Sequence, residues 1–205
     1  MRSNNTPSPS STRTLKSVSH PSTRPGRPKA SSHETLAEAA CELFLEQGFA
    51  ATSVADITRR AGVSRSSFFN YFSSKSDILW AAFDERVDAA ARALSRGVDV
   101  RTALSSIADG FAPDALALAI VNAEQMGIAE ELEREAAVRR ARIGEHVARR
   151  AVSDGMDPLG ADVVGAACGG AVWAAVRAWA HDGAGRAPLS PAMDRALAIA
   201  LILLP

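Results

Sequence analysis

Between positions 64 and 75 the chain carries side chains that can hydrogen-bond to a nucleic acid. The guanidinium of Arg65 can meet a guanine edge through two hydrogen bonds, and the amide of Asn70 is suited to adenine. Nearby hydroxyl and ammonium groups are suited to phosphate oxygens, and we expect these from Thr52, Ser53, Tyr71 and Lys75. The other residues expected on this surface are Ser66, Ser67 and Phe69. The set predicts a surface that reads and holds double-stranded DNA.

Two short helices must position these side chains. Ser53 and Asp56 have the spacing of a capping box at the start of the first helix. Gly62 stands where a residue with positive φ would end that helix. Ser64 is the expected cap of a second helix, in which Phe68 and Phe72 are spaced i, i+4 and face inward. The pattern predicts a helix-turn-helix, whose second helix enters the major groove.

The same pattern continues on both sides of this motif, in residues that share a fixed spacing: Leu36, Ala39, Ala40, Leu43, Phe44, Gly48, Phe49, Thr52, Ser53, Val54, Asp56, Ile57, Ala61, Gly62, Val63, Ser64, Phe68, Tyr71, Phe72, Ser74, Lys75 and Leu79. They resemble the TetR family of bacterial transcriptional regulators, over roughly residues 33–80. Phe69 departs from the family pattern, where Tyr is usual and its hydroxyl would reach a phosphate. The run from Phe68 to Trp80 also resembles an actinobacterial subset that includes the mycofactocin-system regulators.

The resemblance implies an all-α fold with an N-terminal three-helix helix-turn-helix domain and a C-terminal helical domain for ligand binding and dimerisation. The expected divisions are a disordered basic tail at 1–30, the DNA-binding domain at 31–76, and the connector, effector-binding and dimerisation domain at 77–205. It also implies a homodimeric repressor that binds a palindromic DNA operator and is released by a small-molecule effector. The narrower resemblance points to a lipophilic effector, with a fatty acyl-CoA as the first compound to test.

Charge is unevenly distributed, although the net charge of the chain is zero. Every charged residue among positions 1–33 is basic, and Ser, Thr and Pro dominate that segment, which cannot bury a core. Arg24, Arg27 and Lys29 resemble an AT-hook core, and we expect them to enter the narrow A·T minor groove. An ordinary solvated tail is the alternative, and the prolines argue against a transit peptide.

The sequence of the C-terminal region predicts alanine-rich helices at about 76–96, 100–111, 113–125, 128–153, 158–181 and 191–204. Glycines at 165, 169 and 170 offer close-approach points for another helix, so we expect the dimer seam there and in the apolar 196–204 segment. The candidates for an effector pocket are Phe111, Met126, Trp173 and Trp179, with ordinary core packing as the alternative. The arginines at 139, 140, 142, 149 and 150 could grip an acidic ligand or form a solvated face.

Motifs for catalysis are missing. The four histidines lack ligand spacing, and Cys41 and Cys168 read as buried thiols in a reducing cytosol. There is no phosphate loop, nucleophile elbow or HExxH, so we expect no enzyme activity, no cofactor and no metal. Because no uninterrupted run of 18 apolar residues occurs, we expect no membrane association. The family resemblance implies a cytoplasmic bacterial protein, at the nucleoid when bound to DNA. A sequence-tolerant architectural DNA binder, or a small-molecule-binding protein or enzyme with a helix-turn-helix-like N-terminus, remain as alternatives.

Overall fold

The computed structural model describes residues 32–203, and within them the all-α prediction is confirmed. The first four helices are α1 (Ser32–Gln47), α2 (Val54–Ala61), α3 (Arg65–Phe69) and α4 (Asp77–Ser95). The rest are α5 (Val100–Ser105), η1 (Ser106–Ala108), α6 (Ala115–Val121), α7 (Ala129–Ser153), α8 (Pro158–His181), α9 (Ser190–Ala200) and η2 (Leu201–Leu203). The predicted basic tail lies outside the described residues.

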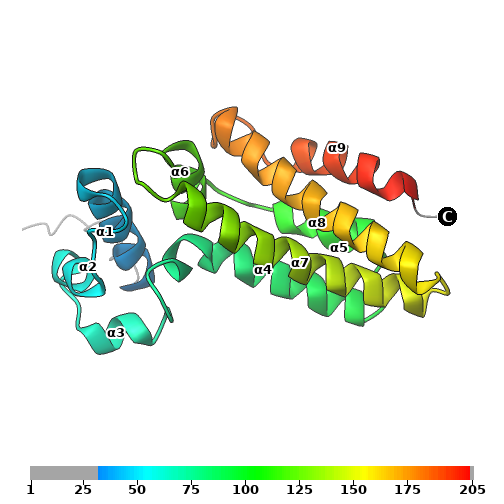
Figure 1. Ribbon diagram of the computed structural model, residues 1–205, viewed down its shortest axis with the longest axis horizontal. Helices are drawn as coiled ribbons and strands as arrows, with labels where there is room; N and C mark the ends of the chain where they lie inside the picture. Colours follow the sequence, from blue (N-terminus) through cyan, green and yellow to red (C-terminus); the bar gives the residue numbers. More distant parts are fainter. Residues whose placement is uncertain (1–31, 204–205) are drawn as a thin grey trace, which may run out of the picture.

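Helices α1 to α3 form one end of the molecule, and α5 to α9 form a larger group in which α6 lies beside α1 (Figure 1). Helix α4 leads from the first group into the second and runs along α7. The predicted boundary between residues 76 and 77 falls at the start of α4. The connector helix therefore belongs to the packing of the larger group while its first turn adjoins the smaller one.

The apolar faces expected from the sequence do point inward in the smaller group. Leu36, Phe44, Ile57 and Phe68 are each 0% exposed. This core is continuous with that of the larger group, since Trp80 at the start of α4 is buried in the same cluster. The three short helices are thus held by packing as well as by their caps.

Helices α7 and α8 pack along their length through glycines. A Cβ built on Gly169 would collide with the carbonyl oxygen of Arg140 on α7, and one built on Gly165 would collide with the carbonyl of Gly144. The close-approach prediction was therefore correct for these positions, but the partner is α7 of the same chain. Gly169 is not part of a dimer seam, whereas Gly170 faces open space.

Helix α8 is long and apolar enough to cross a membrane by length and composition alone, although it contains no uninterrupted run of 18 apolar residues. Half of its most apolar window is buried inside the protein. The helix lies between α7 and α9, where its small residues permit close packing. Its composition is accounted for by this position in the core.

Three helices are shorter than predicted. Helix α5 ends at Ser105 and is followed by a 3₁₀ turn to Ala108. Gly110, with φ 62°, and Pro113 then keep the helix from reaching residue 111. Helix α6 begins only after its cap, Asp114, and ends at Val121. Helix α9 likewise passes into a 3₁₀ turn after Ala200.

Candidate nucleic-acid interface and its connection to the C-terminal helices

The predicted capping box begins helix α2. The backbone N–H of Ser53 donates to Asp56 Oδ2 at 3.0 Å, and the N–H of Asp56 donates to Ser53 Oγ at 3.2 Å. Hydrogen bonds from Ser53 lower the pKa of the Asp56 carboxyl. Gly62 ends the helix with φ 67°, in the left-handed region that the turn requires. Both local predictions are confirmed, and together they fix the angle at which α3 leaves α2.

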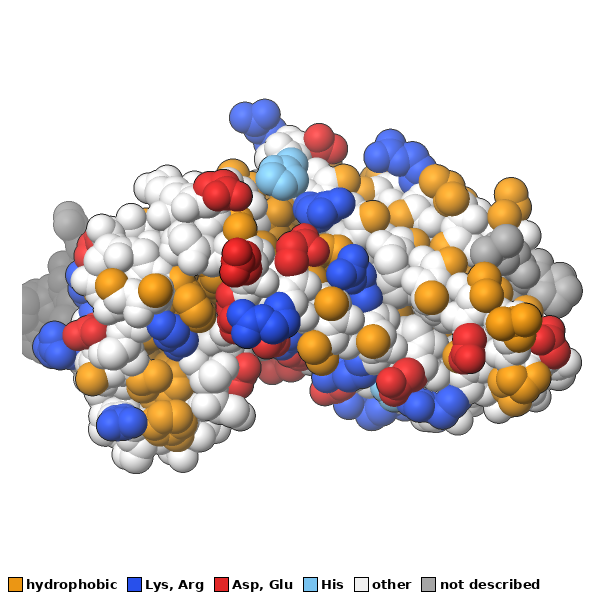
Figure 2. All heavy atoms as spheres, in the orientation of Figure 1, with side chains coloured by type: hydrophobic (Ala, Val, Ile, Leu, Met, Phe, Trp, Pro, Cys, Tyr) orange, Lys and Arg blue, Asp and Glu red, His pale blue; other side chains and the backbone are white. Residues whose placement is uncertain are grey.

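Helix α3 and the turn after it present the aromatic and basic side chains that the sequence placed outside, although α3 ends at Phe69, before Tyr71 and Phe72. Phe68 and Phe72 are buried, while Phe69 and Tyr71 are 49% and 52% exposed. The guanidinium of Arg65 lies 5.6 Å from the centre of the Phe69 ring, a cation–π arrangement that restrains both side chains. Figure 2 shows hydrophobic and basic side chains together over the α3 end of the molecule. The exposed rings have no partner among the C-terminal helices.

The serines of this motif bond mainly to one another. Ser64 Oγ lies 2.8 Å from the hydroxyls of both Ser66 and Ser67, and it accepts the N–H of Ser67 at 3.1 Å. Ser66 is exposed and Ser67 is half-buried, and Asn70 is exposed where it ends α3. Arg24, Arg27 and Lys29 lie outside the described residues, so the minor-groove arm stays a prediction.

The sequence predicted that the Thr52 hydroxyl would face a phosphate, but in the structure this hydroxyl points inward. The residue is 2% exposed, and its Oγ1 donates to the carbonyl of Gly48 at 2.8 Å. The same hydroxyl accepts a hydrogen bond from Gln47 Nε2 at 3.2 Å. The hydroxyl is thus committed to closing the turn between α1 and α2.

Lys75 also points inward, toward the same turn. Its Nζ donates to the carbonyl oxygens of Phe49 at 2.5 Å and Thr52 at 2.9 Å, and lies 4.0 Å from the centre of the Phe49 ring. Burial lowers the pKa of the Lys75 ammonium. Lys75, which the sequence predicted to hold a phosphate, therefore mainly connects the α1–α2 turn to the segment that leads into α4. Since Lys has three donors, only one is left for a phosphate.

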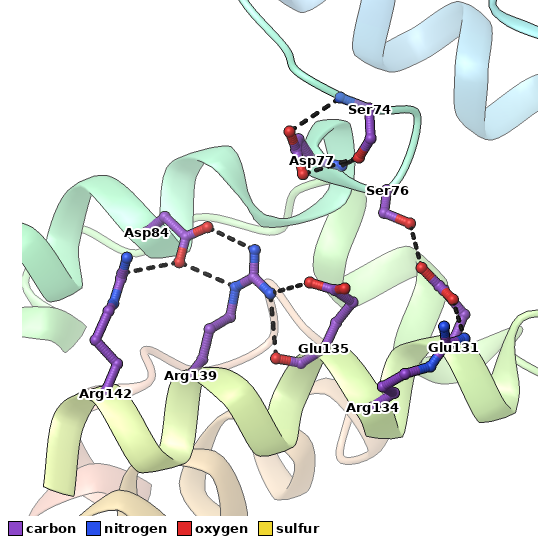
Figure 3. A network of polar contacts seen from close by, with 9 residues as sticks. All are labelled: Ser74, Ser76, Asp77, Asp84, Glu131, Arg134, Glu135, Arg139 and Arg142. Atoms are coloured by element: carbon purple, nitrogen blue, oxygen red, sulfur yellow. Dashed lines mark hydrogen bonds and ion pairs between the residues drawn. The ribbon is translucent and has the colours of Figure 1, made fainter. Parts of the chain in front are cut away.

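The start of α4 is tied to α7 by a chain of polar contacts (Figure 3). Ser76 Oγ donates to Glu131 Oε1 at 2.6 Å, and Glu131 also pairs with Arg134. Just before the helix, Ser74 and Asp77 bond reciprocally, with Ser74 Oγ donating to Asp77 Oδ1 at 2.9 Å. Movement of α7 relative to α4 would therefore act directly on the segment that follows α3.

A second group of contacts lies two turns further along α4, around a buried arginine. Arg139 is 8% exposed and grips Asp84 through Nε at 2.9 Å and Nη2 at 2.7 Å. Its guanidinium also bonds Glu135 and stacks 4.2 Å from the centre of the Trp80 ring. Arg142 adds a bond to Asp84 at 3.0 Å. We call these five residues the Arg139 cluster.

The sequence predicted the i, i+4 pair of Glu135 and Arg139, which the structure contains, but for the arginines of this helix it otherwise offered only an acidic ligand or a solvated face. The spacing of Glu135 and Arg139 along one helix was visible, but Asp84 is 55 residues away in sequence. Only the packing of α4 on α7 brings the carboxylate to the guanidinium. A bidentate pair of this kind fixes the two helices in register as well as in distance.

The four residues predicted for an effector pocket are packed as core instead. Phe111 and Trp179 meet edge to face with ring centres 5.4 Å apart, and Trp173 lies 5.5 Å from Trp80. Met126 is fully buried, and its carbonyl accepts the N–H of Phe49. None of the four lines any of the grooves described below. The alternative of ordinary core packing describes them better.

Both cysteines are buried and free. Burial, with smaller effects of the Asp114 and Glu42 charges, raises the pKa of the Cys41 thiol to about 12. Burial raises that of Cys168 to about 11. Residues 32–203 contain no group of three or more His, Cys, Asp or Glu side chains that could hold a metal ion.

Comparisons with known proteins agree with the helix-turn-helix geometry. The profile of bacterial regulatory proteins, tetR family, matches residues 36–82. The putative mycofactocin biosynthesis transcriptional regulator MftR of Mycobacterium tuberculosis is 40% identical over 60 residues, which is 29% of this chain and 30% of that protein. This chain therefore matches less than a third of that relative's length.

Two solved structures resemble the chain over most of its length. A putative TetR-family transcriptional regulator from Syntrophomonas wolfei has a TM-score of 0.52 at 14% identity, covering 85% of this chain and 95% of that one. FadR of Thermus thermophilus, a TetR-family repressor in complex with lauroyl-CoA, has a TM-score of 0.50 at 23% identity, covering 84% and 95%. At these identities the likeness shows the fold alone.

Proposed function

This chain belongs to the tetR family of bacterial regulatory proteins, and on that premise we propose that it is a ligand-responsive transcriptional repressor. It binds a palindromic operator as a homodimer and is released by a small-molecule effector. The observation that carries the proposal is the exposed surface formed by Arg65 and Phe69 of α3 and by Tyr71 just after it, on a capped and well-packed helix-turn-helix. It acts in the cytoplasm and performs no catalysis.

The DNA contacts divide into base readers and phosphate contacts. Arg65 meets a guanine edge and Asn70 an adenine, while Ser53 and Tyr71 hold phosphates. Phe69 supplies an apolar contact where a tyrosine hydroxyl would have bonded phosphate. Two copies of α3 must lie about 34–36 Å apart to enter successive major grooves.

The homodimer buries the apolar end of the C-terminal helices. Leu159, Val163, Ile199 and Ile202 are between 51% and 82% exposed, on α8, α9 and η2. Figure 2 shows hydrophobic side chains gathered at the end where α8 begins and α9 ends. An exposed apolar surface of this kind favours a protein partner. A second copy of this chain fits, because binding both halves of a palindromic operator requires two copies of α3. Ala200, within the 196–204 segment that the sequence placed at the seam, is buried within its own chain.

The dimer is tested by Val163→Glu, which puts a carboxylate on the exposed apolar face without disturbing the core. Analytical ultracentrifugation should show monomers, with loss of operator binding, because one half-site supplies too few contacts. A Val163→Glu and Ile199→Glu double variant that sediments as an intact dimer would place the interface on another surface.

Electrophoretic mobility shift on the protein's own upstream DNA tests the repressor proposal. Arg65→Ala should cost about 1–3 kcal/mol and relax the preference at one position in each half-site. Arg186→Ala, which removes an exposed arginine from the loop between α8 and α9, is the matched control and should bind as the wild type does. Binding without sequence preference would favour the architectural alternative, and no DNA binding at all would favour a small-molecule-binding protein or enzyme.

The effector and the tail are tested in the same assay. Fatty acyl-CoAs lead the panel of lipophilic compounds, and an active one should release the operator only as far as it binds the DNA-incompetent form more tightly. Deleting residues 1–30 removes six basic residues and should weaken binding and its salt dependence, with the preferred palindrome unchanged. Unchanged binding at low salt would show that the tail plays no part.

A further inference from the structure

A groove rich in arginine lies where the end of α4 meets the C-terminal half of α7. It has a volume of about 440 Å³, and its basic lining is Arg96, Arg149, Arg150 and His146. No carboxylate is among its lining residues. Because the described part of the chain is otherwise acidic, a groove with three guanidiniums and no lining acid is suited to an anion.

These arginines are only partly occupied by neighbouring groups. Arg96 is exposed and has no ion-pair partner among residues 32–203. Arg149 lies 3.8 Å from Glu145, and its Nη2 is 2.8 Å from His146 Nδ1. Arg150 Nε lies 3.0 Å from an Asp154 carboxylate oxygen, without the geometry of a hydrogen bond. Most of the N–H donors on the three guanidiniums therefore remain available.

The floor of the groove opens on an apolar crevice. The two share Ala91, Leu94 and His146, and the crevice continues between α4, α5, η1 and α7. Its other lining residues are aliphatic: Val87, Ala90, Leu104, Ile107 and Ile143. The crevice measures about 10 Å³, which is about the smallest space that holds one water molecule. An aliphatic chain could enter only by moving α4 away from α7.

From these neighbouring features we propose that the basic groove binds the phosphorylated head of an amphipathic effector whose aliphatic part enters the crevice. The proposal rests on the proposed function and places its effector site. Three guanidiniums favour phosphate groups over a single carboxylate, since each phosphate offers several anionic oxygens to the arginine fork. The groove also lies at the C-terminal ends of α4 and α7, where basic residues offset the helix dipoles, so the test must separate the two roles.

Entry of the aliphatic part acts on the DNA-reading end through α4. The crevice lies beside Val87 and Ala90, one turn beyond Asp84 of the Arg139 cluster. Separating α4 from α7 at this point strains the bidentate Arg139–Asp84 pair and, beyond it, the Ser76–Glu131 bond. The force therefore reaches the segment that Lys75 ties to the α1–α2 turn.

Isothermal titration of the full chain with dodecanoyl-CoA, coenzyme A and dodecanoate tests the site directly, without DNA. Dodecanoyl-CoA should bind tightest, coenzyme A more weakly, and dodecanoate weakest. An Arg96→Gln and Arg149→Gln double variant should lose at least about tenfold in affinity for both CoA compounds. Arg186→Gln, in the loop between α8 and α9, is the control for the loss of an exposed arginine and should bind as the wild type does.

A second variant tests the crevice. Ala91→Phe fills the opening of the crevice and should weaken the binding of dodecanoyl-CoA while leaving the affinity for coenzyme A unchanged. If this variant does not fold, the Arg96→Gln and Arg149→Gln double variant still tests the proposal. Wild-type affinity in the double variant overturns the proposal, even if its melting temperature falls, because the arginines would then only stabilise helix ends. Tight dodecanoate binding, or no coenzyme A binding, also overturns it.

The mobility shift then separates this site from the proposed function. Binding that follows the expected pattern but leaves the operator bound supports the groove and contradicts the effector-released repressor. Operator binding that is specific, together with no dodecanoyl-CoA binding, contradicts the groove and leaves DNA recognition standing.

Discussion

Replacing Lys75 by Met separates two roles for this residue, phosphate contact and internal clamp. Methionine keeps the length of the aliphatic stem and removes the ammonium. Two hydrogen bonds are lost, to the carbonyl oxygens of Phe49 and Thr52, together with the cation–π contact to the Phe49 ring. The α1–α2 turn is then held to the start of α4 by packing alone.

The size of the effect follows from these contacts. Hydrogen bonds to a charged group contribute about 1.5–3 kcal/mol each, and a cation–π contact at a partly exposed site about 0.5–1 kcal/mol. Lys75 is half-buried, so we take the lower values. Releasing the lysine side chain returns up to about 2 kcal/mol of rotamer entropy, which offsets part of the loss. The free energy of unfolding should fall by about 2 kcal/mol, or a Tm decrease of about 4–8 °C.

Two measurements on one preparation distinguish the roles. Thermal unfolding followed by circular dichroism should show the lower Tm. Operator affinity measured from about 50 to 200 mM salt should fall uniformly, with the slope of log affinity against log salt unchanged, because no phosphate contact is removed. An unchanged Tm with a slope reduced by about one per subunit would refute the clamp and restore the phosphate contact.

Three further predictions come from buried groups. Gly169→Ala should destabilise the protein in urea unfolding, because the new Cβ meets the carbonyl oxygen of Arg140. Gly170 faces open space, so Gly170→Ala should be neutral or stabilise the protein by up to about 1 kcal/mol. Equal effects of the two substitutions would contradict the close contact between α7 and α8. Arg139→Met should cost about 3 kcal/mol in the same assay by leaving the carboxylates of Asp84 and Glu135 short of a partner, and Arg140→Met, which is more exposed, should cost less than about 1 kcal/mol. Cys41 and Cys168 should resist iodoacetamide at pH 8 until the protein is unfolded, as measured by mass spectrometry, and rapid labelling of the native protein would show that the thiols are accessible. Because their pKa values in the folded protein are raised to about 12 and about 11, the unfolded chain loses these protons first above pH 9, and the free energy of unfolding should fall as the pH rises.

The sequence by itself determined the helix-turn-helix, because that motif is built from interactions a few residues apart. The Ser53–Asp56 box, the glycine at 62 and the i, i+4 pair of phenylalanines depend on spacing along the chain, and each is where the pattern predicted it. The exposure of Phe69 and Tyr71 follows from the same periodicity.

Roles that depend on a distant partner were decided by the tertiary structure alone. Lys75 and Thr52 have side chains suited to phosphate, but folding places carbonyl oxygens of the α1–α2 turn within their reach. The glycines of α8 did mark a helix contact, although composition could not say whether the partner was α7 or another chain.

The effector site differs from its prediction for the same reason. Large apolar residues such as Trp173 and Trp179 are as suitable for a packed core as for a pocket, and here they pack. Arg96 follows the last residue of α4 and Arg149 lies on α7, and the sequence alone does not tell whether such an arginine faces solvent, a carboxylate or a groove. The electrostatic environment of each arginine is set by groups tens of residues away in the sequence, which only the packing of α4 against α7 brings together.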